Sequence, residues 1–89
     1  MDDKTPPDPP PDMPLEQLPA GRAVGIHLRR YRREHAMSQR ALAAWLGWAQ
    51  PTLSRAEHDA STLRLDRVEE LLEYTGARLA IVPIAGRRD

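Results

Sequence analysis

The sequence predicts a small all-α protein of four helices, followed by one short C-terminal strand. Apolar residues recur at helical three- and four-residue spacing over most of residues 20–75. Glycines follow two of these periodic segments, at positions where helices commonly end. A single alternating, β-branched stretch comes after them, at residues 78–82. A chain of 89 residues accommodates one domain of this kind.

Residues 1–19 form a proline-rich, acidic segment. They hold seven of the nine prolines, and one lysine stands against five acidic residues. Because such a segment has few apolar groups to bury and no regular periodicity, we expect a disordered tail. Its charge is opposite to that of the next segment, so it could fold back over the arginines there, but a plain flexible tail is the simpler prediction.

The first helix is expected over residues 20–35. Its inward stripe is Val24, Leu28 and Tyr31, at positions i, i+4 and i+7. Gly21 and Gly25 are four residues apart, a spacing that predicts little in a short helix of a soluble protein.

Positive charge is concentrated in the middle of the chain. Residues 20–58 contain seven arginines and two acidic residues, although the formal net charge of the whole chain is zero. A basic segment of this kind is typical of a phosphate-binding surface. The alternative for the first-helix arginines alone is a solvated helix face.

The second helix is expected over residues 38–46, with a tight turn after it. Ser38 is a favourable N-cap, since its hydroxyl can accept from the free N–H groups of the first turn. Leu42 and Leu46 face inward, and Gly47 ends the helix because a left-handed residue there favours glycine.

The third helix is expected over residues 50–57. Pro51 lies in its first turn, the place where a helix tolerates proline. Leu53 and Ala56 face the core, while polar side chains occupy the other sides. A helix this short is not stable alone in water, so the rest of the domain must hold it in place. Its polar face is therefore presented for a purpose other than folding.

The fourth helix is expected over residues 65–75 and ends at Gly76. Its inward positions are Leu65, Val68, Leu71 and Leu72. The strand after it has no partner in its own subunit, and unpaired strand edges are association sites. We therefore expect residues 77–89 to dimerise through the same strand of a second copy. The strand residues are Arg78, Leu79, Ala80, Ile81 and Val82.

The segment Gln39–Ala56 resembles the helix-turn-helix of the phage repressor and Cro type, the XRE family. Small Ala43 stands where the two helices cross, and Gly47 stands at the turn. The similarity covers about residues 24–76. The apolar positions that match are Leu42, Leu46, Trp48, Leu53 and Ala56. This resemblance implies that residues 20–76 form a DNA-binding domain.

The resemblance also implies which residues contact DNA. The helix at 50–57 would lie in the major groove, where the Gln50 amide can pair with adenine. Gln39 looks like the family glutamine that holds a backbone phosphate and braces the base reader. The remaining candidate contacts are Arg40, Thr52, Ser54 and Arg55. Arg32 and Glu57 match an internal salt bridge of similar proteins, which gives this pair a structural role.

Three positions depart from the family pattern. Ala49 stands where a Ser or Thr cap is usual, and Pro51 stands where a DNA contact is frequent. Asp59 stands where glycine is usual, so we expect a residue strained by left-handed backbone there. Trp45 is expected to be partly buried against the first helix, with an exposed hot spot for a partner as the alternative.

The predicted function is that of a cytoplasmic, homodimeric repressor that reads double-stranded DNA. The C-terminal strand resembles that of HipB-type antitoxins, so an antitoxin that binds a toxin and represses its own operon is the alternative. No nucleophile with a base, paired carboxylates or metal-ligand spacing occurs, so we expect no enzymatic activity, no metal and no cofactor. No apolar run is long enough to span a membrane.

Overall fold

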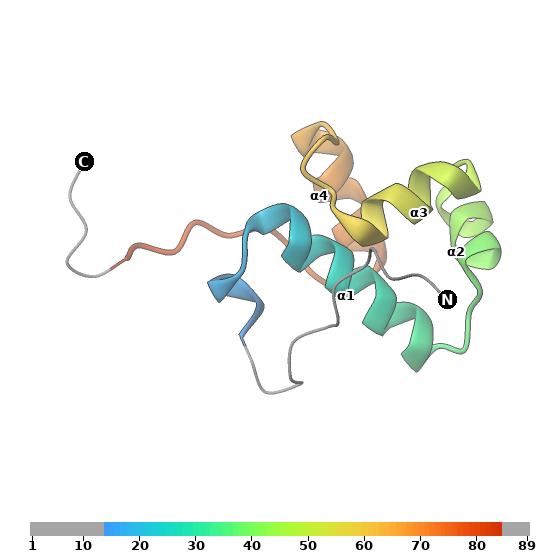
Figure 1. Ribbon diagram of the computed structural model, residues 1–89, viewed down its shortest axis with the longest axis horizontal. Helices are drawn as coiled ribbons and strands as arrows, with labels where there is room; N and C mark the ends of the chain where they lie inside the picture. Colours follow the sequence, from blue (N-terminus) through green and yellow to red (C-terminus); the bar gives the residue numbers. More distant parts are fainter. Residues whose placement is uncertain (1–13, 85–89) are drawn as a thin grey trace.

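The computed structural model describes residues 14–84, and the four predicted helices are confirmed (Figure 1). A 3-10 turn comes before them, in a segment that we expected to lack regular structure. Residues 1–13, which make up most of that segment, lie outside the described part. The elements are η1 (Leu15–Gln17), α1 (Ala20–Glu34), α2 (Gln39–Leu46), α3 (Gln50–His58) and α4 (Leu65–Tyr74).

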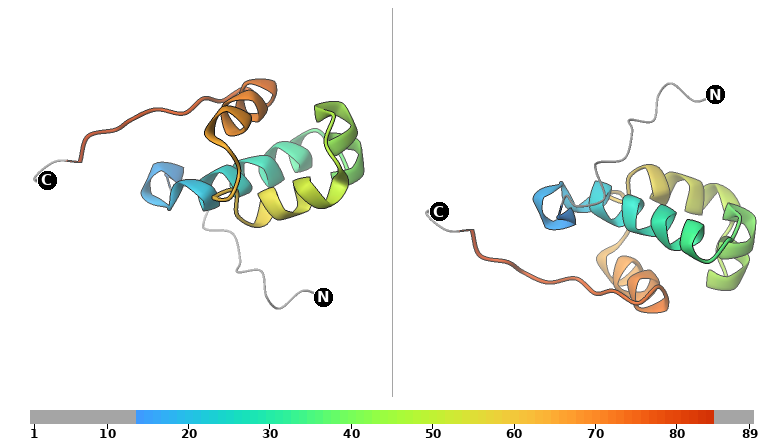
Figure 2. Two further views of the ribbon diagram at one scale, coloured as in Figure 1. Left: turned by 90° about the horizontal axis from the view of Figure 1, so that it is seen from above. Right: turned by 90° about the horizontal axis from the view of Figure 1, so that it is seen from below.

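The long helix α1 is the centre of the arrangement. In both views of Figure 2, α3 and α4 lie on opposite sides of α1, and α2 lies near its C-terminal end. Apolar side chains from all four helices meet in one core. Its buried members are Val24, Leu28, Leu42, Ala43, Leu53, Ala56, Ala60, Val68, Leu71 and Leu72.

Helix α2 begins and ends at the residues that the sequence predicts. The Ser38 hydroxyl accepts from the Ala41 N–H at 3.0 Å. Gly47 adopts φ of +76°, the left-handed conformation that favours glycine. Ala49 precedes α3 without a side-chain cap, and Pro51 lies in the first turn of that helix. The turn between α2 and α3 is therefore fixed by backbone conformation more than by capping of α3.

Helix α1 crosses the C-terminal end of α3 at close range. A Cβ added to Gly25 would clash with the backbone carbonyl of Glu57 and lie 2.9 Å from that of Ala56. A Cβ added to Gly21 would lie 2.7 Å from the Ser61 nitrogen. The spacing of Gly21 and Gly25, which predicted little, is therefore a packing requirement.

Two local predictions are wrong. Leu65 is 66% exposed, because it is the first residue of α4 and lies at the end of the helix, before its first buried residue, Val68. Leu63, in the preceding loop, packs on the core instead. Asp59 has φ of −166°, an extended conformation with no strain, and its carboxylate accepts from the Ser61 N–H at 2.9 Å.

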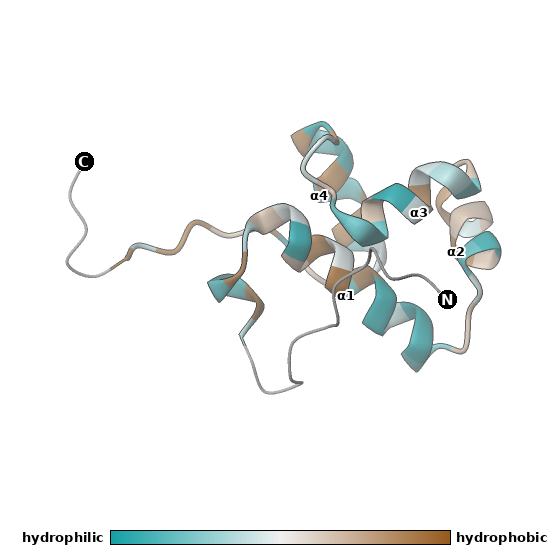
Figure 3. Cartoon of the chain, viewed as in Figure 1, coloured by the Kyte–Doolittle hydropathy of each residue, from teal (hydrophilic) through white to brown (hydrophobic). Residues whose placement is uncertain are grey.

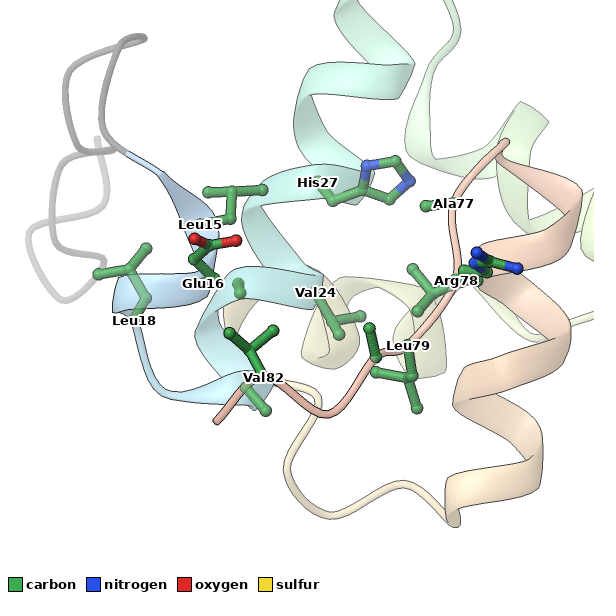
Figure 4. Close-up of a pocket in the computed structure, with 13 residues that line it drawn as sticks. Leu15, Glu16, Leu18, Val24, His27, Ala77, Arg78, Leu79 and Val82 are labelled. Atoms are coloured by element: carbon green, nitrogen blue, oxygen red, sulfur yellow. The ribbon is translucent and has the colours of Figure 1, made fainter. Parts of the chain in front are cut away.

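Residues 78–82 form no strand within the described part of the chain. They belong to an extended segment that runs past the N-terminal end of α1 (Figure 1). Leu79 packs against the core, while Ile81 is 99% exposed. A groove of about 400 Å³ separates this segment from η1 and α1. Apolar side chains line most of it, among them Leu15, Leu18, Val24, Leu79 and Val82 (Figure 4).

Candidate nucleic-acid interface

Helix α3 presents a polar face to the outside. Pro51, Arg55 and His58 are exposed and recur at spacings of three and four residues, so they lie on one side of the helix. Gln50 and Ser54 are half-buried on one flank of this ridge. Thr52 is half-buried on the opposite flank, beside the core residues. The candidate residues of α3 are thus divided between the ridge and its flanks.

His58 is a member of this face that the sequence-based prediction missed. We expected the helix to end at Glu57, with His58 in a loop. The observed helix continues to His58. The residue therefore lies one turn beyond Ser54 and Arg55 and, like Arg55, is exposed. The sequence already indicated this position, because His58 lies four residues after Ser54 and three after Arg55.

The C-terminal end of α3 is joined to α1 by an ion pair between Arg32 and Glu57. Arg32 Nε lies 2.6 Å from Glu57 Oε2, and a second guanidinium nitrogen donates to Oε1 at 3.0 Å. Arg32 also donates to the Met37 carbonyl at 3.2 Å. The Glu57 side chain is 2% exposed and that of Arg32 is 22% exposed. This bidentate geometry fixes both side chains, since two parallel hydrogen bonds define the plane of each group.

A hydrogen-bonded chain continues from Glu57 to the start of α3. Gln39 Nε2 donates to Glu57 Oε1 at 2.9 Å, and Gln50 Nε2 donates to Gln39 Oε1 at 2.7 Å. An ionised carboxylate only accepts hydrogen bonds, so the amide nitrogen of Gln39 must face Glu57. Its oxygen then faces Gln50, which must donate. We call this chain of four side chains, Arg32–Glu57–Gln39–Gln50, the relay.

The relay determines what Gln50 can offer to a ligand. One of its two amide hydrogens is engaged by Gln39. The second hydrogen and the carbonyl oxygen remain for another partner. Gln50 therefore presents one donor and one acceptor side by side.

Two exposed arginines lie on the helices that form this site. Arg40 is exposed at the start of α2, next to Gln39, and Arg55 is exposed on α3. The C-terminal half of α1 is strongly hydrophilic (Figure 3). An anionic ligand that approaches α3 would therefore meet guanidinium groups from α2 and α3.

An aromatic cluster joins side chains of α1, α2 and α4. Trp45 of α2 stacks on Tyr31 of α1 at a centroid distance of 6.3 Å and meets Tyr74 of α4 edge-on at 5.5 Å. Trp45 nevertheless remains 51% exposed, and Tyr74 remains 49% exposed. The predicted partial burial of Trp45 against α1 is confirmed, and its other face meets solvent. Trp48 packs against the core and carries the Arg67 guanidinium 5.4 Å from its ring centre.

Two groups outside the ridge titrate abnormally. Burial lowers the pKa of His27 below its ordinary 6.5, against smaller raising effects of Thr75 and Glu34. The Thr75 hydroxyl donates to the Leu71 carbonyl, so it accepts from His27 Nε2, which lies 2.9 Å away. Hydrogen bonds from Ser61 lower the pKa of Asp59 below its ordinary 3.8.

Within residues 14–84, no group of three or more potential metal ligands is assembled. No helix of this described part has the length and hydropathy needed to cross a membrane.

Two packed helices, the tight turn at Gly47 and the polar face of α3 define a DNA-binding helix-turn-helix protein. A family model described as a helix-turn-helix domain matches residues 23–80, and the chain belongs to that family. The match spans α2 and α3 together with nearly all of α1 and the whole of α4. Comparisons with curated proteins and with solved structures gave no match.

Proposed function

We propose that this protein is a sequence-specific transcriptional repressor that reads the major groove with α3. The observation that carries the proposal is the relay, because it fixes a polar side chain at the start of α3. Preorganised groups bind with a smaller loss of conformational entropy than mobile ones. Arg40 and Arg55 supply positive charge on either side, for contacts to phosphate or to guanine.

The free groups of Gln50 favour adenine over guanine. Adenine offers a donor at N6 and an acceptor at N7, which match the remaining oxygen and hydrogen of the Gln50 amide. Guanine offers two acceptors, O6 and N7, and would need two free hydrogens on Gln50. The bond to Gln39 has already used one of them. Gln39 is thus a positioning residue, while Thr52 and Ser54 are within reach of the phosphates or bases beside it.

The test compares Gln50→Ala with Arg40→Ala in the full-length protein. The preferred duplex is first selected from a random pool at physiological salt, and affinities for single-base variants are then measured. Gln50→Ala is expected to lose about 1–3 kcal/mol of discrimination at one adenine position, while Arg40→Ala weakens all sequences alike. An unchanged base preference in Gln50→Ala contradicts the assignment of Gln50 as the reader.

A homodimer formed through residues 78–82 fits the C-terminal segment. This segment is extended and lies beside an apolar groove, and its Ile81 and Val82 are 99% and 56% exposed. Two copies paired here would present two α3 helices to half-sites about 34 Å apart. Ala80→Pro removes one backbone donor from such a pair, so light scattering should detect a lower dimer fraction than in Ala80→Ser. A monomeric wild-type protein would rule out this arrangement.

The second candidate function is that of an antitoxin. The observation that favours it is the half-exposed aromatic pair Trp45–Tyr74, because exposed tryptophan and tyrosine are typical anchors of protein interfaces. α4, which carries Tyr74, lies on the other side of α1 from α3, so a protein bound there would leave α3 accessible (Figure 2). Co-purification of a toxin with the wild-type protein, lost in Trp45→Ala, would support this role.

A further inference from the structure

Three of the four tyrosine and tryptophan side chains of this chain meet in one row, and the sequence has no phenylalanine. Tyr31 of α1, Trp45 of α2 and Tyr74 of α4 form the row, with Trp45 between the two tyrosines. The fourth, Trp48, packs against the core instead. We call the three side chains the aromatic row. Its members come from three helices, so the row exists only in the folded domain.

The aromatic row is open to a partner and fixed in orientation. Trp45 and Tyr74 are both about half exposed. Ala41, one turn before Trp45 on α2, is exposed as well, and its small side chain leaves the Trp45 ring approachable. Because Tyr31 and Tyr74 hold that ring from two sides, docking on it costs little conformational entropy. Preorganised, half-exposed aromatic side chains of this kind are typical anchors of protein interfaces.

The charge beside the aromatic row is negative. Glu34 lies three residues after Tyr31, and Glu70 lies four residues before Tyr74, so each carboxylate is one helical turn from a ring. Both glutamates are exposed. Within α1, α2 and α4, no lysine or arginine has this spacing from a ring of the row. The faces of aromatic rings also attract cations, so the rings and the carboxylates favour the same kind of partner.

We propose that the aromatic row binds a basic segment of another protein. An aliphatic side chain of that segment packs on Trp45, and the lysine or arginine side chains beside it pair with Glu34 and Glu70. This inference rests on the second proposed function, because it names the chemistry of the protein bound there. Aromatic rows can also stack the bases of single-stranded nucleic acids, but such sites line positively charged grooves. The two carboxylates repel phosphate, so the charge favours a protein.

The test selects peptides from a random library against the full-length protein, without DNA. We expect the enriched peptides to carry net positive charge beside an aliphatic residue. They should bind Trp45→Ala about tenfold or more weakly than the wild type, since the variant loses the central anchor. Because Trp45 also packs on α1, circular dichroism first checks that the variant keeps its helices.

A charge reversal tests the proposal with the aromatic row intact. Glu70→Lys should weaken binding of the selected peptides roughly three- to tenfold at low salt, because attraction is replaced by repulsion. The matched control is Glu69→Lys, the same change at the neighbouring exposed residue, which lies about 140° around α4 from Tyr74. This control should bind nearly as well as the wild type, and raised salt should reduce the difference between the two variants.

A selection that enriches no basic peptide would overturn the proposal, as would peptides that bind both Trp45→Ala and Glu70→Lys as tightly as the wild type. Two other results would assign the row to a different occupant and also overturn it. One is binding of a single-stranded oligonucleotide that Trp45→Ala abolishes, and the other is self-association that the same variant abolishes. If basic peptides bind as expected while no toxin co-purifies, the antitoxin role fails and the basic partner stands. A toxin that stays bound to Trp45→Ala and Glu70→Lys supports the antitoxin role and refutes the row as its site.

Discussion

Replacing Glu57 by alanine tests whether the relay holds α3 in place. The substitution removes three hydrogen bonds, two from Arg32 at 2.6 and 3.0 Å and one from Gln39 at 2.9 Å. It also leaves the Arg32 guanidinium without its carboxylate in a site where only 22% of that side chain is exposed. The loss therefore combines broken bonds with an uncompensated charge.

Breaking a buried ion pair from one side typically costs about 3–5 kcal/mol. Because Arg32 retains some contact with water, we expect a value near the lower end, about 3 kcal/mol. A small domain has only about 5–15 kcal/mol of stability, so this is a large fraction of the total. Urea unfolding should show a midpoint lowered by about 1–3 M at an unchanged slope. The matched control, Glu73→Ala on the exposed face of α4, should change stability by less than about 0.5 kcal/mol.

The double variant Arg32→Met, Glu57→Leu separates pairing from packing. It removes both charges and keeps apolar volume, so it should be more stable than Glu57→Ala alone. The reasoning is refuted if Glu57→Ala costs less than about 1 kcal/mol, or if the double variant loses as much as the two single changes added together.

Two further predictions concern α1 and the turn that follows it. Ala36 has φ of +53°, so Ala36→Gly should raise the free energy of unfolding by up to about 1 kcal/mol. The control Ala44→Gly, inside α2, should lower it by about 1 kcal/mol. Equal losses of stability in both variants would contradict the strain at Ala36. Burial lowers the pKa of His27, so the unfolded chain takes up a proton first as the pH falls below 6.5, and stability should decrease in that direction until the native pKa is passed. Urea midpoints at about pH 5 and 7.5 should differ less in His27→Gln than in the wild type; an unchanged pH dependence would show that His27 does not cause it.

The fold was predictable because local signals and the core agree. Ser38 and Gly47 delimit α2 through capping and backbone conformation, both of which depend only on nearby residues. The exposure of Leu65 was not predictable, since helical spacing places it on the core side of α4 and only the path of the preceding loop brings Leu63 there instead. The packing role of Gly25 was not predictable either, because its nearest contact is the backbone of Glu57, 32 residues away in the sequence.

The candidate site likewise has features that the sequence predicted and features that only the structure shows. The pair Arg32–Glu57 was anticipated from a resemblance, as was the link between Gln39 and Gln50. That the two pairs share one carboxylate was not anticipated, because it depends on the distance between Gln39 Nε2 and Glu57 Oε1. Sequence spacing gives the face on which a residue lies, but not which of two acceptors a donor reaches.

The shared carboxylate links the two ends of α3. Glu57 lies in the last turn of the helix and is held by α1, whereas Gln50 is its first residue and is held through α2. A helix of nine residues has little stability of its own, so its orientation depends on such external contacts. With both ends tied to the same carboxylate, a shift of α1 relative to α3 would move the Gln50 amide as well. The core fixes where α3 lies, and the relay fixes which atoms it presents.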